Sequence, residues 1–391
     1  MKESINRQIF FRRLAVILFF IVLVLRLFQL FTPDKKYSET ENRNLQARPE
    51  ANLTRIVSGR YSTAMETCVS DQFPFRTGWV QLKGLSDRLM GKTESNNIFL
   101  SDRGYLIENF ISPDQKVCQD RLKKLKQFVQ SQKKLKQYML IAPTAVSIYR
   151  DLLPEFAPAG DQDAFLDQLK TDAEDAGITF VDVRDAFRSA EETQLYYKTD
   201  HHWTTDGAYL AYRQFAQAAG LKETAVSYQR MLVTDSFRGT MSASSGFRMW
   251  EKEKMYIYLP EKGGVEYAVN YVSEGLKSAS FYETDKLDVR DKYAVFLGGN
   301  HSLVKITTAA GSGKVILLLK DSYANCFVPF LAEHYDKILM VDPRYYYDDL
   351  KQLISSEKVT DVLYLYNANG FAQDTSLADV LENAAGEASE K

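Results

Sequence analysis

The longest hydrophobic stretch of the chain lies close to its N-terminus. Residues 14–31 carry a single charged side chain, that of Arg26. Four basic side chains precede this stretch within residues 1–13, namely Lys2, Arg7, Arg12 and Arg13. About 20 helical residues span the hydrocarbon core of a bilayer, and an arginine near the helix end extends its guanidinium to the interface. The pattern predicts a transmembrane helix at 14–31, with residues 1–13 in the cytoplasm.

A cleaved signal peptide would share the basic start and the apolar run. Cleavage needs small residues around the cut, whereas the chain continues as Thr32-Pro33-Asp34-Lys35-Lys36. We therefore expect an uncleaved anchor in the cell membrane that crosses it once, with the rest of the chain outside the cytoplasm.

Beyond the anchor, the hydrophobic pattern predicts a polar stalk at 32–60 and an α/β domain at 61–380. Apolar runs of strand length alternate with amphipathic helical patterns, which is typical of a mainly parallel sheet flanked by helices on both faces. Strands are expected at 138–142, 178–183, 315–319, 338–341 and 362–366. Helices are expected at 114–134, 164–176, 185–192, 204–220, 326–334 and 348–355.

The start of this domain has its own pattern. Residues 61–90 show helical spacing that is broken at Phe73-Pro74. Residues 97–107 have the pattern of two strands joined by a tight turn.

Residues 225–312 interrupt the α/β alternation. Gly and Ser clusters separate short aromatic and β-branched runs there, which predicts a β-rich insertion that forms a lid or rim. Its strands are expected at 255–259, 267–272 and 293–297. The acidic tail, residues 381–391, is expected to be frayed helix or disordered.

Composition is that of an ordinary globular protein. Hydrophobic residues make up 45% and charged residues 26% of the 391 positions, and the net charge is −2 at pH 7. Because this charge does not attract a polyanion, we expect no nucleic-acid partner. The 23 Tyr and 23 Phe residues fit either sheet cores or a sugar-binding groove.

The three cysteines, Cys68, Cys118 and Cys326, are odd in number and far apart. Since no CxxC pair occurs, they indicate neither a zinc site nor a disulfide framework. We expect no metal and no other cofactor. A Cys68–Cys118 bridge in an oxidising compartment stays open.

Four histidines occur, and two of them lie in the segment Asp200-His201-His202-Trp203. In an extended chain the first and third side chains point the same way, so Asp200 can bond one ring nitrogen of His202 and leave the other as a base. Alternatively, both histidines are buried and bonded to backbone. A metal site is less expected, because adjacent histidines rarely converge on one ion.

Ser322 is the candidate nucleophile that complements this pair. It follows the strand expected at 315–319 and precedes a predicted helix, whose first backbone N–H groups can stabilise an oxyanion. Taken alone, Ser322 fits an ordinary helix N-cap better than a nucleophile, and only together with Asp200-x-His202 does it favour a triad.

Three further polar residues are candidates for oxyanion or substrate binding. Asn367 ends the last predicted strand and offers an amide donor, although a turn also explains it. Arg344 follows another strand and either binds a carboxylate or is solvated. Asn300 lies in a Gly-Gly-Asn-His stretch that a hairpin turn also explains.

The segment Asp200-His201-His202-Trp203, followed by a helix that opens Thr-Thr-Asp-Gly-Ala, resembles the signature of the DHHW protein family. It is also similar to the alginate O-acetylation proteins, in which an Asp-x-His-Trp segment precedes the serine turn. That order is a circular permutation of the SGNH hydrolases. The likeness extends to Glu41-Asn42-Arg43, to residues 71–76 and to residues 99–106.

The resemblance implies an SGNH-hydrolase-like α/β fold with Asp200, His202 and Ser322 as a catalytic triad, and no catalytic role for His201. It implies a membrane-anchored O-acetyltransferase of a cell-surface polysaccharide. It also implies a membrane-bound O-acyltransferase partner that supplies acyl groups across the bilayer.

Two other functions remain open from the sequence. A carbohydrate acetylesterase would use the same triad and transfer the acyl group to water. A non-catalytic accessory protein would bind polysaccharide or the acyltransferase with an unproductive triad. The turn Lys320-Asp321-Ser322 differs from the Gly-Thr-Ser of the alginate proteins, so alginate itself is not implied.

Overall fold

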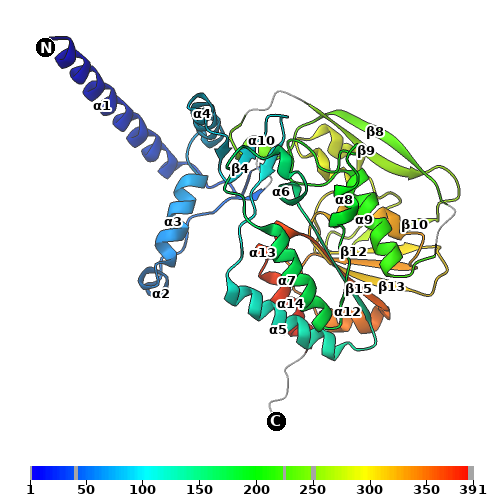
Figure 1. The fold of residues 1–391 in the computed structure, drawn as a ribbon. Helices are drawn as coiled ribbons and strands as arrows, with labels where there is room; N and C mark the ends of the chain where they lie inside the picture. The colour runs from blue at the N-terminus through cyan, green and yellow to red at the C-terminus, as the bar shows by residue number, and fades with distance from the viewer. Residues whose placement is uncertain (1, 39–42, 223–225, 248–251, 386–391) are drawn as a thin grey trace. The chain divides into compact units, whose positions relative to one another are not determined.

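The computed structural model describes residues 2–38, 43–222, 226–247 and 252–385 (Figure 1). Its first helix, α1 (Lys2–Phe31), contains the hydrophobic helix that the sequence predicts. Within Arg7–Phe31, an 18-residue window has a mean hydropathy of 2.7 and is almost entirely unburied. By length and composition it suits either a membrane anchor or a signal sequence. Glu41 and Asn42 of the family resemblance, and residues 386–391 of the acidic tail, lie outside the described residues.

Tertiary contacts divide the chain into two compact units, Met1–Lys92 with Ala243–Arg248, and Thr93–Ser242 with Met249–Lys391. Beyond α1 the first unit contains β1 (Tyr37–Ser38), β2 (Arg43–Asn44), α2 (Leu53–Val57), α3 (Arg60–Asp71) and α4 (Arg76–Leu89). The predicted helix break at Phe73-Pro74 is confirmed, because it falls between α3 and α4.

An eight-stranded mixed sheet forms the centre of the second unit, in the order β11-β10-β12-β14-β13-β15-β6-β7. The strands are β6 (Lys136–Ala142), β7 (Thr179–Phe180), β10 (Tyr267–Tyr271), β11 (Leu276–Ser278), β12 (Leu303–Thr308), β13 (Val315–Lys320), β14 (Lys337–Val341) and β15 (Asp361–Asn367). Strands β14, β13, β15, β6 and β7 are parallel. Strands β12, β10 and β11 extend one edge antiparallel, so part of the predicted insertion belongs to the main sheet.

Side chains that alternate along the strands build one core on each face of this sheet. Along β13, Ile316 and Leu318 pack in one core, and Leu317 and Leu319 pack in the other. The helices are α5 (Gln115–Ser131), α6 (Ala145–Ile148), α7 (Gln162–Asp175), α8 (Arg184–Arg188), α9 (Thr205–Ala218), α11 (Ala324–Phe327), α12 (Leu350–Glu357), α13 (Ala368–Gln373) and α14 (Ser376–Ala385). Helices α8 and α9 cover the first face, and α5, α7, α12 and α14 cover the second (Figure 1). The predicted α/β fold is confirmed.

Two smaller sheets lie outside the main one. Strands β3 (Glu94–Ser95), β4 (Ile98–Leu100) and β5 (Leu106–Glu108) form an antiparallel sheet, which confirms the predicted strand-turn-strand pattern. In the insertion, β8 (Tyr228–Phe237) pairs antiparallel with β9 (Glu253–Pro260). The short helix α10 (Met241–Ser244) lies between β8 and β9 in the chain.

The strand predicted at 293–297 is wrong. Lys292–Val295 form a 3-10 helix, in which Tyr293 and Val295 are buried. A short run of aromatic and β-branched residues indicates a buried segment. Buried strands and short buried helices both have such runs, and periodicity alone cannot distinguish them.

Several α/β elements are shorter than predicted. The helix predicted at 326–334 is α11 followed by the 3-10 helix Val328–Leu331. Pro329 contributes to this change, because it has no amide hydrogen for an α-helical bond. The strand predicted at 178–183 is limited to β7, and the helix predicted at 185–192 is limited to α8.

All three cysteines are free. Burial raises the pKa of the Cys326 thiol to about 12, which makes it a poor nucleophile.

Candidate active site

The carboxyl ends of the parallel strands bring several predicted site residues to one edge of the sheet. Ser322 follows β13, Asn367 ends β15, and Arg344 follows β14. Ligands of open α/β sheets bind outside the carboxyl ends of the strands. Ser322 and Asn367, which are 45 positions apart in sequence, therefore line a common pocket with Arg344.

The two histidines lie on a loop between α8 and α9. A β-bridge between Tyr196 and Trp203 closes the loop at its base. Thr204 caps α9, since its hydroxyl accepts a hydrogen bond of 3.2 Å from the Gly207 N–H. The buried Trp203 Nε1 donates to the Tyr323 carbonyl at 3.1 Å, which connects the histidine loop to the serine turn.

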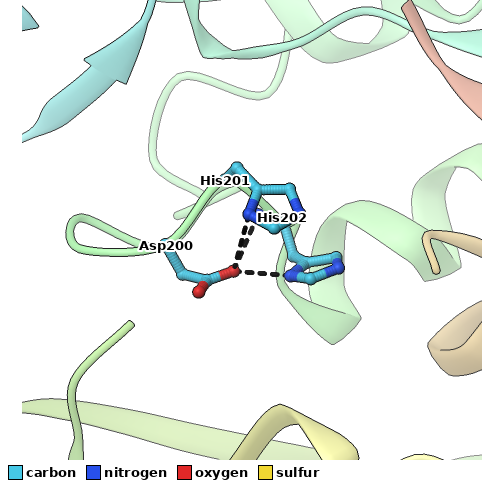
Figure 2. Close-up of side chains that lie close together, drawn as sticks. All are labelled: Asp200, His201 and His202. Carbon is cyan, nitrogen blue, oxygen red and sulfur yellow. Dashed lines mark hydrogen bonds and ion pairs between the residues drawn. The ribbon is translucent and has the colours of Figure 1, made fainter. Parts of the chain in front are cut away.

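His202 bridges the other two predicted triad residues. Its Nδ1 lies 2.5 Å from Asp200 Oδ1, and its Nε2 lies 2.7 Å from Ser322 Oγ. Figure 2 shows Asp200 directed toward both histidine rings. His202 and Asp200 are buried, 4% and 2% exposed, so the Asp200–His202 contact is shielded from bulk water.

Asp200 is held ionised by its neighbours. Burial alone would raise the pKa of its carboxyl group, but attraction to His202 and His201 outweighs burial and holds that pKa well below its usual range. The Thr240 N–H and hydroxyl donate to Asp200 Oδ2 at 3.0 and 3.2 Å. Gly239 allows this approach, because a Cβ there would lie 2.3 Å from the Cβ of Asp200.

Glu253 supports the loop from the start of β9. Its buried carboxylate accepts hydrogen bonds from the Lys198 N–H at 2.6 Å and from the Thr199 N–H and hydroxyl at 2.8 and 2.6 Å. The sequence pattern does not mark Glu253, Gly239 and Thr240 as site residues. They follow the histidines by 37 or more residues, and no local pattern marks them.

The His202 ring is packed between two other rings. The buried Tyr293 ring stacks on it with centroids 3.7 Å apart and an interplanar angle of 11°, and the His201 ring lies 3.9 Å away. Tyr293 in turn donates its hydroxyl to Cys326 Sγ at 3.1 Å. The stack limits rotation of His202. Tyr293 was not predicted as a site residue either, because the sequence predicts a strand at residues 293–297.

Asp321, next to the serine, is buried among N–H donors. Its carboxylate accepts from the Tyr323 N–H at 2.9 Å and from the Asn367 N–H and Nδ2 at 2.9 and 2.6 Å. Burial nevertheless raises the pKa of Asp321 to about 6. Asn367 also accepts from the Gly370 N–H as the N-cap of α13, and it lines the pocket together with Ser322.

The other two candidates have structural partners. Arg344 donates through Nε and Nη2 to the fully buried Asp342, at 2.8 and 2.6 Å. Asn300 accepts from the buried Lys320 Nζ at 3.0 Å. Among the described residues that line the pocket at Ser322, Arg344 is present and Asn300 is not.

Asp200, His201 and His202 have ligand atoms within 4.8 Å of one another, close enough to share a metal ion. However, Asp200 and Ser322 occupy both ring nitrogens of His202. The arrangement therefore suits proton transfer between hydrogen-bonded groups better than metal binding.

Residues 108–252 match the family model described as SGNH hydrolase-like domain, acetyltransferase AlgX. The matched segment includes Asp200 and His202 and ends before Ser322. No curated protein sequence matches the chain.

Solved structures resemble the chain over most of its length. A DHHW family protein from Eubacterium siraeum DSM 15702 is 21% identical with a TM-score of 0.61, and the match covers 74% of this chain and 96% of that one. PatB1 from Bacillus cereus is 21% identical with a TM-score of 0.59, covering 71% and 98%. A PatB1 structure with a sulfonyl adduct has a TM-score of 0.58 at 21% identity, also covering 71% of this chain, and 97% of that one. The resemblance expected from the sequence is confirmed at the level of fold, and the chain carries an SGNH-hydrolase-like domain.

Proposed function

We propose that this chain is an O-acetyltransferase of a cell-surface polysaccharide, with Ser322 as nucleophile, His202 as base and Asp200 as the carboxylate that orients His202. The proposal rests above all on the His202 ring, whose nitrogens lie 2.5 Å from Asp200 Oδ1 and 2.7 Å from Ser322 Oγ. The family description, acetyltransferase AlgX, supports acyl transfer as the reaction class. Polysaccharide O-acetylation follows from the resemblance to that family.

In the first half-reaction, Ser322 Oγ attacks the carbonyl carbon of an acyl donor while His202 Nε2 takes the hydroxyl proton. His202 then gives this proton to the leaving group, and acyl-Ser322 remains. In the second half, His202 takes a proton from a sugar hydroxyl, whose oxygen attacks the acyl group. The Ser322 oxygen leaves and regains its proton from His202.

The oxyanion of each half-reaction needs hydrogen-bond donors. The Ser322 backbone N–H makes no hydrogen bond to another described residue. Asn367 Nδ2 carries a second hydrogen beside the one it donates to Asp321. We assign both to the oxyanion.

The membrane topology is part of the proposal. Basic residues precede the hydrophobic segment of α1, which favours a cytoplasmic N-terminus and an extracytoplasmic main domain. In this arrangement a membrane-bound O-acyltransferase would deliver acyl groups to the side of the bilayer on which Ser322 lies.

The test uses the full chain in detergent with an activated acetyl ester, with and without oligosaccharide acceptors. We expect ester cleavage that is lost in Ser322→Ala and His202→Ala and kept in His334→Gln. His334 is a matched control, because it is a buried histidine bonded to the Tyr212 hydroxyl and not to the pocket residues.

The products separate the three functions. Acetyl groups on the sugar support the transferase, and acetate alone identifies an acetylesterase. Ester cleavage that is absent, or that persists in Ser322→Ala, contradicts the proposal and leaves the accessory-protein role.

A further inference from the structure

The pocket that opens at Ser322 has a volume of about 230 Å³. Pockets for drug-sized ligands measure roughly 300–1,000 Å³, so this one has the scale of a single small ring. Its lining is polar and includes Glu108, Tyr366, Asn369 and Asp374 beside Ser322.

Two buried polar atoms in this lining lack a partner. Among the described residues, Tyr366 Oη and Asp374 Oδ2 are buried without a hydrogen-bond partner, and both residues line this pocket. Tyr366 is 1% exposed, and Asp374 uses its other oxygen to accept from the Ser376 N–H at 2.7 Å. Native proteins rarely bury polar atoms unpaired, so these two indicate a ligand that supplies hydrogen bonds.

The charge of the lining restricts that ligand. Three carboxylates line the pocket, those of Glu108, Asp321 and Asp374, against one guanidinium, that of Arg344. The Arg344 charge is already paired with Asp342. Carboxylates repel an anionic ligand and accept hydrogen bonds from hydroxyl groups.

We propose that this pocket is a subsite for the acceptor sugar, which binds an uncharged sugar ring through its hydroxyl groups and discriminates against uronic acids. Tyr366 and Asp374 contact the ring hydroxyls, and one of these hydroxyls faces Ser322. That the bound sugar is the acetyl acceptor rests on the proposed function, whereas the binding itself does not.

The test measures binding by titration calorimetry to the full chain in detergent carrying Ser322→Ala, in which no transfer occurs. Two β-1,4-linked pentasaccharides serve as probes, one of neutral hexoses and one of hexuronic acids. We expect the neutral sugar to bind at least about tenfold more tightly, because carboxylates line the pocket.

Two substitutions and one control locate the site. Tyr366→Phe should weaken binding of the neutral sugar about fivefold. Asp374→Asn should weaken it about tenfold and should narrow the difference in affinity between the neutral sugar and the uronic acid. Both leave the existing protein hydrogen bonds intact. Tyr335→Phe is the matched control, since Tyr335 is also fully buried with an unpaired hydroxyl but lies outside the pocket. It should change nothing.

The proposal is overturned if the uronic acid binds as tightly, if the neutral sugar does not bind, or if Tyr366→Phe behaves like Tyr335→Phe. Neutral-sugar binding without any Ser322-dependent ester cleavage supports the subsite and contradicts only the proposed function. Ester cleavage by the serine enzyme without sugar binding contradicts only the subsite.

Discussion

Two buried aspartates, Asp200 and Asp321, flank the His202–Ser322 pair, and their pKa values are shifted in opposite directions. They are 2% and 4% exposed, and each accepts several hydrogen bonds. Yet the pKa of Asp200 is held well below its usual range, whereas that of Asp321 is raised to about 6. The depth of burial therefore does not set the charge of these carboxylates.

The difference lies in what each carboxylate faces. Desolvation raises the pKa of Asp200, but attraction to His202 and His201 outweighs it and favours the ionised carboxylate. Asp321 is bonded to neutral N–H groups, which offset its desolvation only in part. We infer that Asp200 stabilises charge that develops on His202, while Asp321 holds the serine turn against Asn367. The predictions that follow test this division.

The largest expected effect is that of Asp200→Asn. The amide cannot stabilise an imidazolium and favours the wrong tautomer of His202, so kcat for ester cleavage should fall on the order of 10⁴-fold. Asp206→Asn is the control, since Asp206 lies in the first turn of α9 and bonds to Tyr258 and Arg230. A loss of less than tenfold in Asp200→Asn would remove Asp200 from the mechanism.

The pH dependence of stability should separate the aspartates next. Because the pKa of Asp321 is raised from 3.8 to about 6, its contribution to stability is full below pH 4 and is lost as pH rises through 6. The free energy of unfolding of wild type minus that of Asp321→Asn should therefore fall by about 3 kcal/mol between pH 4 and 7.

Asp200 should show the reverse sign. Its depressed pKa gives stability that is present above pH 4 and is lost as pH falls below it. Denaturant unfolding at several pH values measures both aspartates. If the free energies of unfolding of wild type and Asp321→Asn depend on pH in the same way, the pKa of Asp321 is not raised in the folded state.

The smallest expected effect is that of Thr240→Val. The change removes the hydroxyl donor 3.2 Å from Asp200 Oδ2 and keeps the backbone donor at 3.0 Å. One hydrogen bond to a partly satisfied carboxylate is worth about 1 kcal/mol, so kcat should fall about fivefold. Thr234→Val is a control on the neighbouring β8, where the hydroxyl bonds to Ser236. Equal losses in both variants would indicate a general effect on the insertion.

Local patterns allowed much of this structure to be predicted. The Asp-x-His spacing predicted Asp200 beside His202, and the strand pattern predicted Ser322 directly after β13. Glu253, Thr240 and Tyr293 were not predicted, because they reach the site through tertiary contacts that no period of 2 or 3.6 residues encodes. For the same reason, neither the pairing of β12 with β14 nor the hydrogen bond from Lys320 to Asn300 could be predicted.

The spacing between the two halves of the site has a consequence for how such chains diversify. His202 and Ser322 are 120 residues apart in sequence, and the β8–β9 pair lies in that interval. Loop-closure entropy grows only logarithmically, by about 0.6 kcal/mol for each doubling of loop length. The exposed segment that follows Pro260, residues 261–264, can therefore gain or lose residues at little thermodynamic cost. The end of the β8–β9 pair at Phe237 and Glu253 has no such freedom, because Glu253 and the nearby Gly239 pack against the Asp200 loop. Relatives should therefore vary in length after Pro260 and stay constant at the Phe237–Glu253 end.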